Sequence, residues 1–233
     1  MSALPGDYDH DPDRFAANEE ATRRLVAGGD LHERFAQRFA AAGCRSVLDV
    51  GGGTGALARR LRAVSVGSVV VDRAGHLVRA PRPVVRGDAR RLPFAAGSFD
   101  GAAALWMLYH LSDPLVALRE VRRVLRPGGW FAVCTSGRHN DPELAGVLPG
   151  WGRPSTFDAE DAVDLVAQVL EVVDVVRWDA PLAAIPDRAA LALFLRGRGL
   201  SEVDAVAAAA RLEVPMTVTK RGMLAWARRP TSG

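Results

Sequence analysis

Cysteine, lysine and long apolar runs are scarce in this chain of 233 residues. The two cysteines, Cys44 and Cys134, are too few for a disulfide framework, and both are interpreted as small, reduced, buried residues. Lys220 is the single lysine, and the accompanying excess of arginine is typical of a GC-rich genome. No run approaches the roughly 20 apolar residues of a membrane span, and residues 1–13 lack the apolar segment of a targeting signal. We therefore expect a cytoplasmic protein that binds no membrane.

Features of metal and nucleic-acid sites are also missing. No group of histidines, cysteines and carboxylates has the spacing of metal ligands, so we expect no metal. The pI is 9.4, but the net charge is only +3. Arg119, Arg122, Arg123 and Arg126 would share one helix face, which is interpreted as a solvated face and not as a phosphate-binding patch. We therefore expect no nucleic-acid partner.

A strand, a glycine loop and a helix follow one another at residues 47–62. A β-branched run (47–50) leads into the glycines of 51–55, whose backbone can approach a ligand closely. Gly51, Gly53 and Ala56 satisfy a dinucleotide fingerprint, with Asp72 about 20 residues further on. The loop alone is therefore compatible with NAD and with another adenosine-containing cofactor. Asp49, inside the strand, needs a partner or a ligand, because buried carboxylates are rarely left unpaired.

The rest of the chain alternates short strands with helices, and the strands are expected at 47–50, 69–71, 84–85, 102–105 and 130–134. This pattern predicts an α/β fold with a parallel sheet and helices on both faces. No repeat or linker divides the chain, so we expect one domain over residues 1–233. Its parts are a helical N-terminal cap (1–43), a cofactor-binding core (44–136) and a C-terminal part (137–233) with inserted helices at about 187–212.

Capping residues predict where several helices begin and end. Asp30 precedes a helix over 31–42, and Asp113 precedes a helix over 114–125 that the Pro127-Gly128-Gly129 run would stop. In the last third the pattern predicts a helix over 157–170 begun by Asp158, a strand over 171–178, two helices within 187–212 broken at Gly197 and Gly199, and a last strand or hairpin over 216–227.

Four motifs point to one known family: VLDVGGGTG (47–55), VVVD (69–72), GDARRLPFAAGSFD (87–100) and LREVRRVLRPGGWFAV (118–133). In this order and spacing they resemble the class I S-adenosylmethionine-dependent methyltransferases, of the small-molecule type common in bacteria. The resemblance covers residues 44 to about 136. It implies a Rossmann-like, doubly wound, three-layer α/β/α fold with a seven-stranded sheet of order 3-2-1-4-5-7-6 and an antiparallel last strand.

The resemblance also implies S-adenosyl-L-methionine as the cofactor, bound by the loop and by the strand ends. The residues concerned are Gly51 and Gly53 with Asp49 for the amino-acid part, Gly55 in the same loop, Asp72 at the ribose with Arg73 after it, Asp88 with the Ala89 backbone at the adenine amino group, and Leu105, Trp106 and Leu92 over the ring. Capping of the following turns is the alternative for Asp72 and Asp88, and an ion pair with a helix arginine is the alternative for Asp49. After Asp72, the Arg73-Ala74-Gly75 run predicts a short or irregular crossover helix.

Candidate catalytic residues follow the fourth and fifth strands: Tyr109, His110 and His139. His110 is the first choice as a general base because an imidazole exchanges protons near neutral pH, and a loop-closing hydrogen bond is the alternative. For His139 the alternative is an exposed turn over 137–141. Tyr8, Arg14, Phe15 and Asn18 would close over the cofactor, or else form an ordinary surface helix.

The expected reaction is methyl transfer to an O, N or C nucleophile of a small-molecule metabolite, by a monomer or a homodimer. Enzymes of this fold that methylate nucleobase amines resemble one another in an Asn/Asp-Pro-Pro-aromatic motif after the fourth strand. Residues 105–110 lack this motif, which disfavours a nucleobase amine as the acceptor. Two alternatives remain open. One keeps the cofactor without methyl transfer, as a cyclase, an aminocarboxypropyl transferase or a non-catalytic S-adenosylmethionine-binding protein, and the other is an NAD(P)-dependent oxidoreductase.

Overall fold

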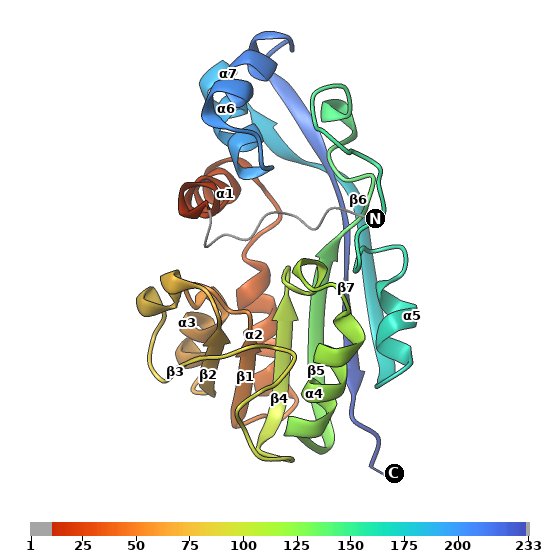
Figure 1. Ribbon diagram of the computed structural model, residues 1–233. Helices are drawn as coiled ribbons and strands as arrows, with labels where there is room; N and C mark the ends of the chain where they lie inside the picture. Colours follow the sequence, from red (N-terminus) through yellow and green to blue (C-terminus); the bar gives the residue numbers. More distant parts are fainter. Residues whose placement is uncertain (1–10, 232–233) are drawn as a thin grey trace.

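The computed structural model describes residues 11–231, which fold around a seven-stranded sheet of order β3-β2-β1-β4-β5-β7-β6 (Figure 1). Strands β1 to β5 pair in parallel, and β7 runs antiparallel to both β5 and β6. This confirms the expected strand order and the antiparallel last strand. The strands are β1 (Ser46–Val50), β2 (Gly67–Asp72), β3 (Val84–Arg86), β4 (Phe99–Leu105), β5 (Leu125–Ser136), β6 (Glu171–Ile185) and β7 (Met216–Arg228).

Helices cover both faces of the sheet, as the alternating pattern predicts. Val47 of β1 packs in one core with Phe39, and its neighbour Leu48 packs in another with Leu118. Successive side chains of a strand point to opposite faces of the sheet. Both β1 residues are fully buried because helices cover both faces. The first face carries α2 (Leu31–Ala41) and α3 (Ala56–Ala63), and the second carries α4 (Pro114–Val124) and α5 (Ala162–Ala167).

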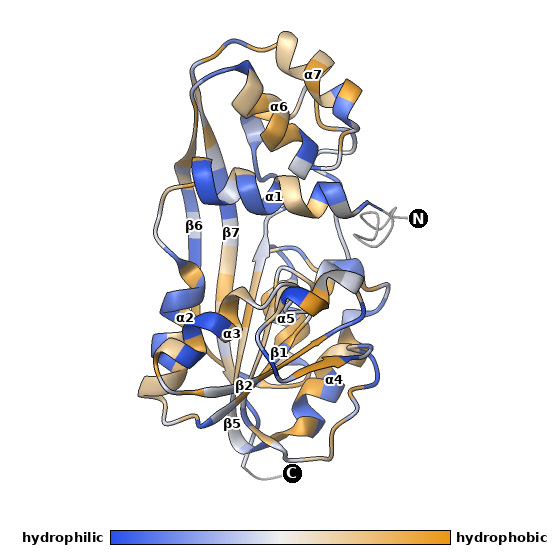
Figure 2. Ribbon diagram, turned by 90° about the vertical axis from the view of Figure 1, so that its left-hand side faces the viewer, coloured by the Kyte–Doolittle hydropathy of each residue, from blue (hydrophilic) through white to orange (hydrophobic). Residues whose placement is uncertain are grey.

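A second, smaller core lies beyond the carboxyl ends of the parallel strands. The long strands β6 and β7 continue past the rest of the sheet and carry α6 (Arg188–Gly197) and α7 (Glu202–Ala210), with α1 (Pro12–Leu25) packed beside them (Figure 1). We call α1, α6, α7 and these strand ends the cap. Figure 2 shows hydrophobic residues along the central strands and hydrophilic ones along much of α1.

Close backbone contacts hold α1 in the cap. A Cβ atom on Gly197 would lie 2.8 Å from the Cα atom of Asn18, so only glycine lets α6 approach α1 this closely. After α1, the Ala27 amide donates to the Leu182 carbonyl at 2.7 Å, which ties the chain to β6. The first helix is therefore attached to α6 and β6, which lie more than 150 residues further along the chain. None of the helices within residues 11–231 is long and apolar enough to cross a membrane.

Several predicted boundaries are confirmed. Asp30 and Asp113 cap their helices, accepting hydrogen bonds from the amides of His32 and Leu115. The crossover after β2 contains only a short 3-10 helix, η1 (Gly75–Arg79), as the irregular sequence there predicts. The two helices expected within 187–212 are α6 and α7.

Three predicted boundaries are wrong. The helix expected over 157–170 is only α5, because the Asp158 carboxylate binds Arg138 and the Ser155 amide and does not cap a helix. The helix expected over 114–125 ends at Val124, and the Pro127-Gly128-Gly129 run lies inside β5. The strand expected over 171–178 continues to Ile185, because β7 pairs with it along that length.

Candidate active site

The carboxyl ends of the parallel strands and the underside of the cap enclose a cavity of about 1790 Å³. Its wall includes the glycine loop after β1, the ends of β2, β4 and β5, and residues of α1 and α6. Ligands of open α/β sheets bind at this edge, near the point where the strand order reverses. The cavity is therefore the candidate site.

The glycine loop is shaped by steric contacts on both sides. Gly51 has a φ of +66°, and a Cβ atom there would lie 2.7 Å from Cγ of Met107. A Cβ atom on Gly52 would lie 2.4 Å from the carboxyl carbon of Asp49. Side chains at either position would displace a neighbour, so the glycines let the backbone fold tightly around the Asp49 carboxylate. Gly55 has a φ of +80° at the start of α3 and faces Pro81, away from the cavity wall.

Asp49 is a buried carboxylate that lacks a cation. The residue is only 2% exposed, and its Oδ2 atom accepts no hydrogen bond from any residue in the range 11–231. Burial, and after it the nearby Asp72 carboxylate, raise the pKa of Asp49 from 3.8 to about 7. No arginine within that range pairs with it, so the ion-pair alternative does not hold for the described residues. A ligand that brings N–H donors or positive charge would satisfy this group.

Asp72 connects the glycine loop to the turn after β2. Its Oδ2 atom accepts from the Gly53 amide at 2.9 Å, and its Oδ1 atom accepts from the Ala74 amide at 2.8 Å. The side chain thus caps a turn and also lines the cavity. Each carboxylate oxygen has a second acceptor position, so Asp72 can still receive two hydroxyl groups.

Asp88 makes a closed local pair. Its carboxylate accepts from the Arg90 amide at 2.8 Å and from the Arg90 guanidinium at 2.6 Å, and this guanidinium lowers the pKa of Asp88. Asp88, Ala89 and Arg73 all lie on the cavity wall. An adenine amino group would compete with Arg90 for the Asp88 oxygens, whereas the Ala89 backbone has no such rival side chain.

Leu105 and Trp106 line the cavity where β4 ends. Trp106 has a φ of +51°, an uncommon conformation for a non-glycine residue, and such strain is concentrated at functional sites. The indole lies 5.7 Å from the His32 ring, measured between ring centroids. The turn at Trp106 redirects the chain into the segment that carries the candidate base.

Tyr109 and His110 follow in the 3-10 helix η2 (Leu108–His110), and both line the cavity. Their ring centroids are 4.5 Å apart. The Thr156 hydroxyl donates to the Leu111 carbonyl at 2.7 Å, which fixes the end of this segment. The structure therefore brings both predicted residues to the same wall as the glycine loop.

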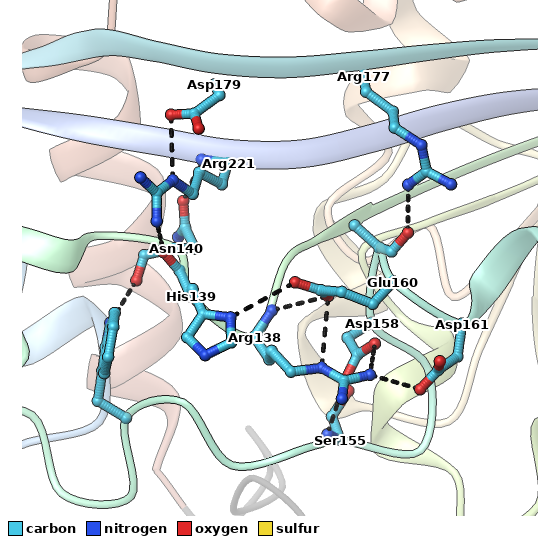
Figure 3. A network of polar contacts seen from close by, with 12 residues as sticks. Arg138, His139, Asn140, Ser155, Asp158, Glu160, Asp161, Arg177, Asp179 and Arg221 are labelled. Atoms are coloured by element: carbon cyan, nitrogen blue, oxygen red, sulfur yellow. Dashed lines mark hydrogen bonds and ion pairs between the residues drawn. The ribbon is translucent and has the colours of Figure 1, made fainter.

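His139 lies elsewhere. Its Nδ1 atom is 3.8 Å from Oε1 of Glu160, and its ring packs against Trp151 with a centroid distance of 5.2 Å (Figure 3). His139 is absent from the cavity wall, whereas its neighbour Arg138 reaches the wall and pairs with Asp158 at 2.9 Å. The structure thus separates His139 from Tyr109 and His110.

His139 lies in an exposed turn, which is the alternative that the sequence of 137–141 indicates, but the end of this loop is buried. Its last residue, Asp141, is 1% exposed and has a φ of +59°. The Asp141 carboxylate accepts from Lys220 at 2.5 Å and from Arg198 at 2.6 Å. No sequence pattern indicated that Asp141, Lys220 and Arg198 come together. The one signal in the sequence is that Lys220 is the single lysine.

The first helix contributes to both halves of the cavity. Arg14, Phe15 and Asn18 line it, as expected for a cap, while Tyr8 lies outside the described residues. The Thr54 hydroxyl of the glycine loop donates to Glu19 at 2.7 Å, a contact that the sequence analysis also missed. Side chains of α1, which lies outside all four motifs, therefore complete the site.

Comparison with known proteins gives a consistent set of relatives. A family profile described as a methyltransferase domain matches residues 48–133. The chain is 29% identical to the O-methyltransferase resE of Aspergillus sclerotiorum, over 80% of this chain and 76% of that protein. It is 30% identical to a demethylmenaquinone methyltransferase of Corynebacterium kroppenstedtii, over 67% of this chain and 68% of that protein.

Solved structures share the fold at lower identity. The [4+2]-cyclase SpnF superposes with a TM-score of 0.65 at 20% identity, covering 99% of this chain and all of that one. The YcgJ protein of Bacillus subtilis gives a TM-score of 0.61 at 20% identity, covering 85% of this chain and 99% of that one. Both therefore share the overall fold of this chain.

Proposed function

The chain belongs to the class I S-adenosylmethionine-dependent methyltransferases, and from this premise we propose that it methylates an O, N or C nucleophile of a small-molecule acceptor, as a monomer or a homodimer. The relatives named as an O-methyltransferase and a demethylmenaquinone methyltransferase support a small acceptor. The cavity of about 1790 Å³ supports it as well, since it has room for a cofactor and a second molecule.

The observation that carries the proposal is the unsatisfied carboxylate of Asp49 beneath the glycine loop. S-adenosylmethionine carries an ammonium group, two ribose hydroxyls and an adenine, and supplies a methyl group already activated by a sulfonium. In the proposed site, Asp49 and the loop from Gly51 to Gly53 hold the ammonium end. Asp72 accepts the ribose hydroxyls beside Arg73, and Asp88, Ala89, Leu105 and Trp106 surround the adenine.

The protein's own contribution is mainly to position the acceptor and to exclude water, because the methyl group needs little further activation. The cap contributes residues of α1 and α6 to one wall of the cavity. His110 is proposed to take the proton from an acceptor hydroxyl or ammonium, with Tyr109 beside it orienting the acceptor. His139 is left out of this proposal, because its imidazole faces Glu160 and Trp151 and not the cavity.

Binding measurements test the cofactor part of the proposal. Calorimetry should detect both S-adenosylmethionine and S-adenosylhomocysteine, whereas NADH should produce no change in fluorescence. If neither sulfur nucleoside binds at millimolar concentration, the proposal fails. An acceptor screen that measures S-adenosylhomocysteine release then tests methyl transfer, and release of methylthioadenosine would instead indicate aminocarboxypropyl chemistry.

The role of His110 is tested with a matched pair of variants. His110→Ala should reduce turnover about a hundredfold, the usual contribution of a general base, and should flatten the pH profile between 6 and 9. His139→Ala, the same change outside the cavity, should leave turnover unchanged. Full activity of His110→Ala across this pH range would remove His110 from the mechanism.

A further inference from the structure

Three charged residues form a cluster beneath the cap: Asp141, Arg198 and Lys220, which we call the cap cluster. Asp141 lies in the loop after β5, Arg198 follows α6, and Lys220 lies on β7. One Asp141 oxygen accepts from Lys220 Nζ, and the other accepts from Arg198 Nε. The side chains of Asp141, Lys220 and Arg198 are 1%, 12% and 22% exposed. The cluster is therefore largely removed from solvent.

The charges of the cap cluster do not balance. Arg198 and the protonated form of Lys220 share one carboxylate, and buried charges are normally matched by opposite charge. Burial, and after it the repulsion of Arg198, lower the pKa of Lys220 from 10.5 to about 7, although Asp141 and Glu143 oppose this. The Glu143 carboxylate is bonded to Thr219 and does not line the cavity. A second anion next to Lys220 would complete the cluster.

The unbalanced cations face the cavity, and the buried carboxylate lies behind them. Lys220 and Arg198 both line the cavity wall, whereas Asp141 does not. Arg198 also donates from Nη1 to Asn18 of α1, and its guanidinium carbon lies 4.4 Å from the centroid of the Phe194 ring. Lys220 has three donor hydrogens, of which Asp141 receives one. The cluster thus presents oriented donors to the cavity from a fixed support.

Most carboxylates of the cavity lining are already paired with arginine. Glu20, Asp30, Asp88 and Asp158 pair with Arg23, Arg60, Arg90 and Arg138. The other lining carboxylates of the described residues, Glu19, Asp49 and Asp72, lie on or near the glycine loop. An anionic acceptor group beside Lys220 and Arg198 would therefore meet little unpaired negative charge.

We propose that Lys220 and Arg198 bind an anionic group of the methyl acceptor, a carboxylate or a phosphate ester, with Asp141 holding the two cations in place. This inference rests on the proposed function of the same cavity. It assigns an acidic acceptor class, and it gives Lys220 a binding role that a purely structural ion-pair network would not have.

Because Lys220 is the single lysine, its response to an anion can be followed as one signal. The protein would be prepared with lysine carrying ¹³C at Cε and saturated with S-adenosylhomocysteine. It would then be titrated with inorganic phosphate, with phenyl phosphate and with benzoate, against chloride at matched ionic strength. We expect a saturable shift of the Lys220 signal with the three test anions, and none with chloride.

Variants of Arg198 test whether the response comes from the cap cluster. Arg198→Met should weaken the anion response about tenfold, because it removes charge-assisted hydrogen bonds. Arg198→Lys keeps the positive charge and should weaken the anion response less than Arg198→Met does. Arg211→Met, the same change at an exposed arginine after α7, should leave the response unaltered. If Arg198→Met does not fold, the comparison between Arg198→Lys and the native chain decides.

Each other outcome overturns the inference. Absence of a saturable shift would mean that the cap cluster is only structural. A shift produced by S-adenosylhomocysteine alone and unaltered by further anions would mean that the cluster binds the carboxylate of the cofactor. An equal response to methyl benzoate and to benzoate would exclude recognition of charge. Calorimetry with S-adenosylmethionine on the same preparation separates these outcomes from failure of the proposed function, which predicts binding in every case.

Discussion

Asp49 and Asp141 are buried almost equally, at 2% and 1% exposure, but their surroundings differ. Beside the glycine loop, burial and Asp72 raise the pKa of Asp49 to about 7. Beneath the cap, burial also raises the pKa of Asp141, but Arg198 and Lys220 outweigh it and leave that pKa below its ordinary value. Burial alone therefore does not decide the charge of a carboxylate; the partners that the fold supplies do. Among the described residues, no cation pairs with Asp49, whereas two basic side chains share Asp141.

The largest effect is expected where a complete buried pair is broken. Asp141→Asn removes the carboxylate that Arg198 and Lys220 share, and should lower the free energy of unfolding by about 3–5 kcal/mol in urea denaturation. Asp179→Asn breaks the pair between Arg221 and the 63% exposed Asp179 side chain, and should change it little. Equal losses in the two variants would contradict the contrast between the buried and exposed pairs.

The same change at Asp49 should have the opposite effect on the free protein. Because the folded-state pKa of about 7 exceeds the ordinary 3.8, the native chain should lose stability as the pH rises from about 4 to about 7. Asp49→Asn should abolish this loss and be the more stable protein at pH 8. It should also bind S-adenosylmethionine more weakly by about 2 kcal/mol, or roughly thirtyfold. Denaturation and calorimetry would measure the two effects, and unchanged affinity would remove Asp49 from the site.

The cofactor affinity of the native chain should depend on pH in a defined direction. Only the ionised Asp49 attracts an ammonium group, and with a pKa of about 7 it is about one-tenth ionised at pH 6. The dissociation constant of S-adenosylmethionine should therefore rise about tenfold between pH 8 and pH 6, with proton release on binding near pH 7. Asp49→Asn should show neither effect. An affinity independent of pH in the native chain would argue against this carboxylate as the partner.

The smallest effect concerns helix α1, whose neighbouring residues Asn18 and Glu19 contact the two regions separately. Thr54→Val removes the hydrogen bond to Glu19 and should weaken S-adenosylmethionine binding by about 1 kcal/mol. Asn18→Ala removes the contact with Arg198 and should weaken the phosphate response of Lys220, with S-adenosylmethionine binding retained. If both variants affect both ligands alike, α1 acts as one rigid unit and does not serve the two regions separately.

Local sequence was sufficient for the central part of the fold. The strand and glycine loop of 47–55 and the caps Asp30 and Asp113 depend on interactions within a few residues, so local patterns predicted these elements. The strand order was expected from the family that the four ordered motifs resemble, and the structure confirms it. Asp72 caps its turn locally, yet it also reaches the Gly53 amide across a strand crossover. Even here, the second contact needed the sheet to form first.

Two side chains, Asp158 and His139, contact partners that are distant in the sequence, and local patterns did not indicate these contacts. Asp158 has the sequence context of a helix cap, but Arg138, twenty residues away, binds its carboxylate instead. His139 resembles Tyr109 and His110 in following a strand, but Glu160 and Trp151 hold it away from the cavity. In both cases the competing contact has a large sequence separation, which no local pattern encodes.

The sequence by itself determined the alternating strands and helices and the glycine loop, because these follow from short-range backbone preferences and from the periodicity of buried residues. The four ordered motifs indicated the family, and the resemblance to that family implied the sheet order. Only the tertiary structure decided the charges of the cavity. It left Asp49 without a cation, and it brought Arg198 and Lys220, 57 and 79 residues beyond Asp141, onto that single carboxylate. The physical reason is that a pKa depends on burial and on charges a few ångströms away, and both are properties of the packed chain.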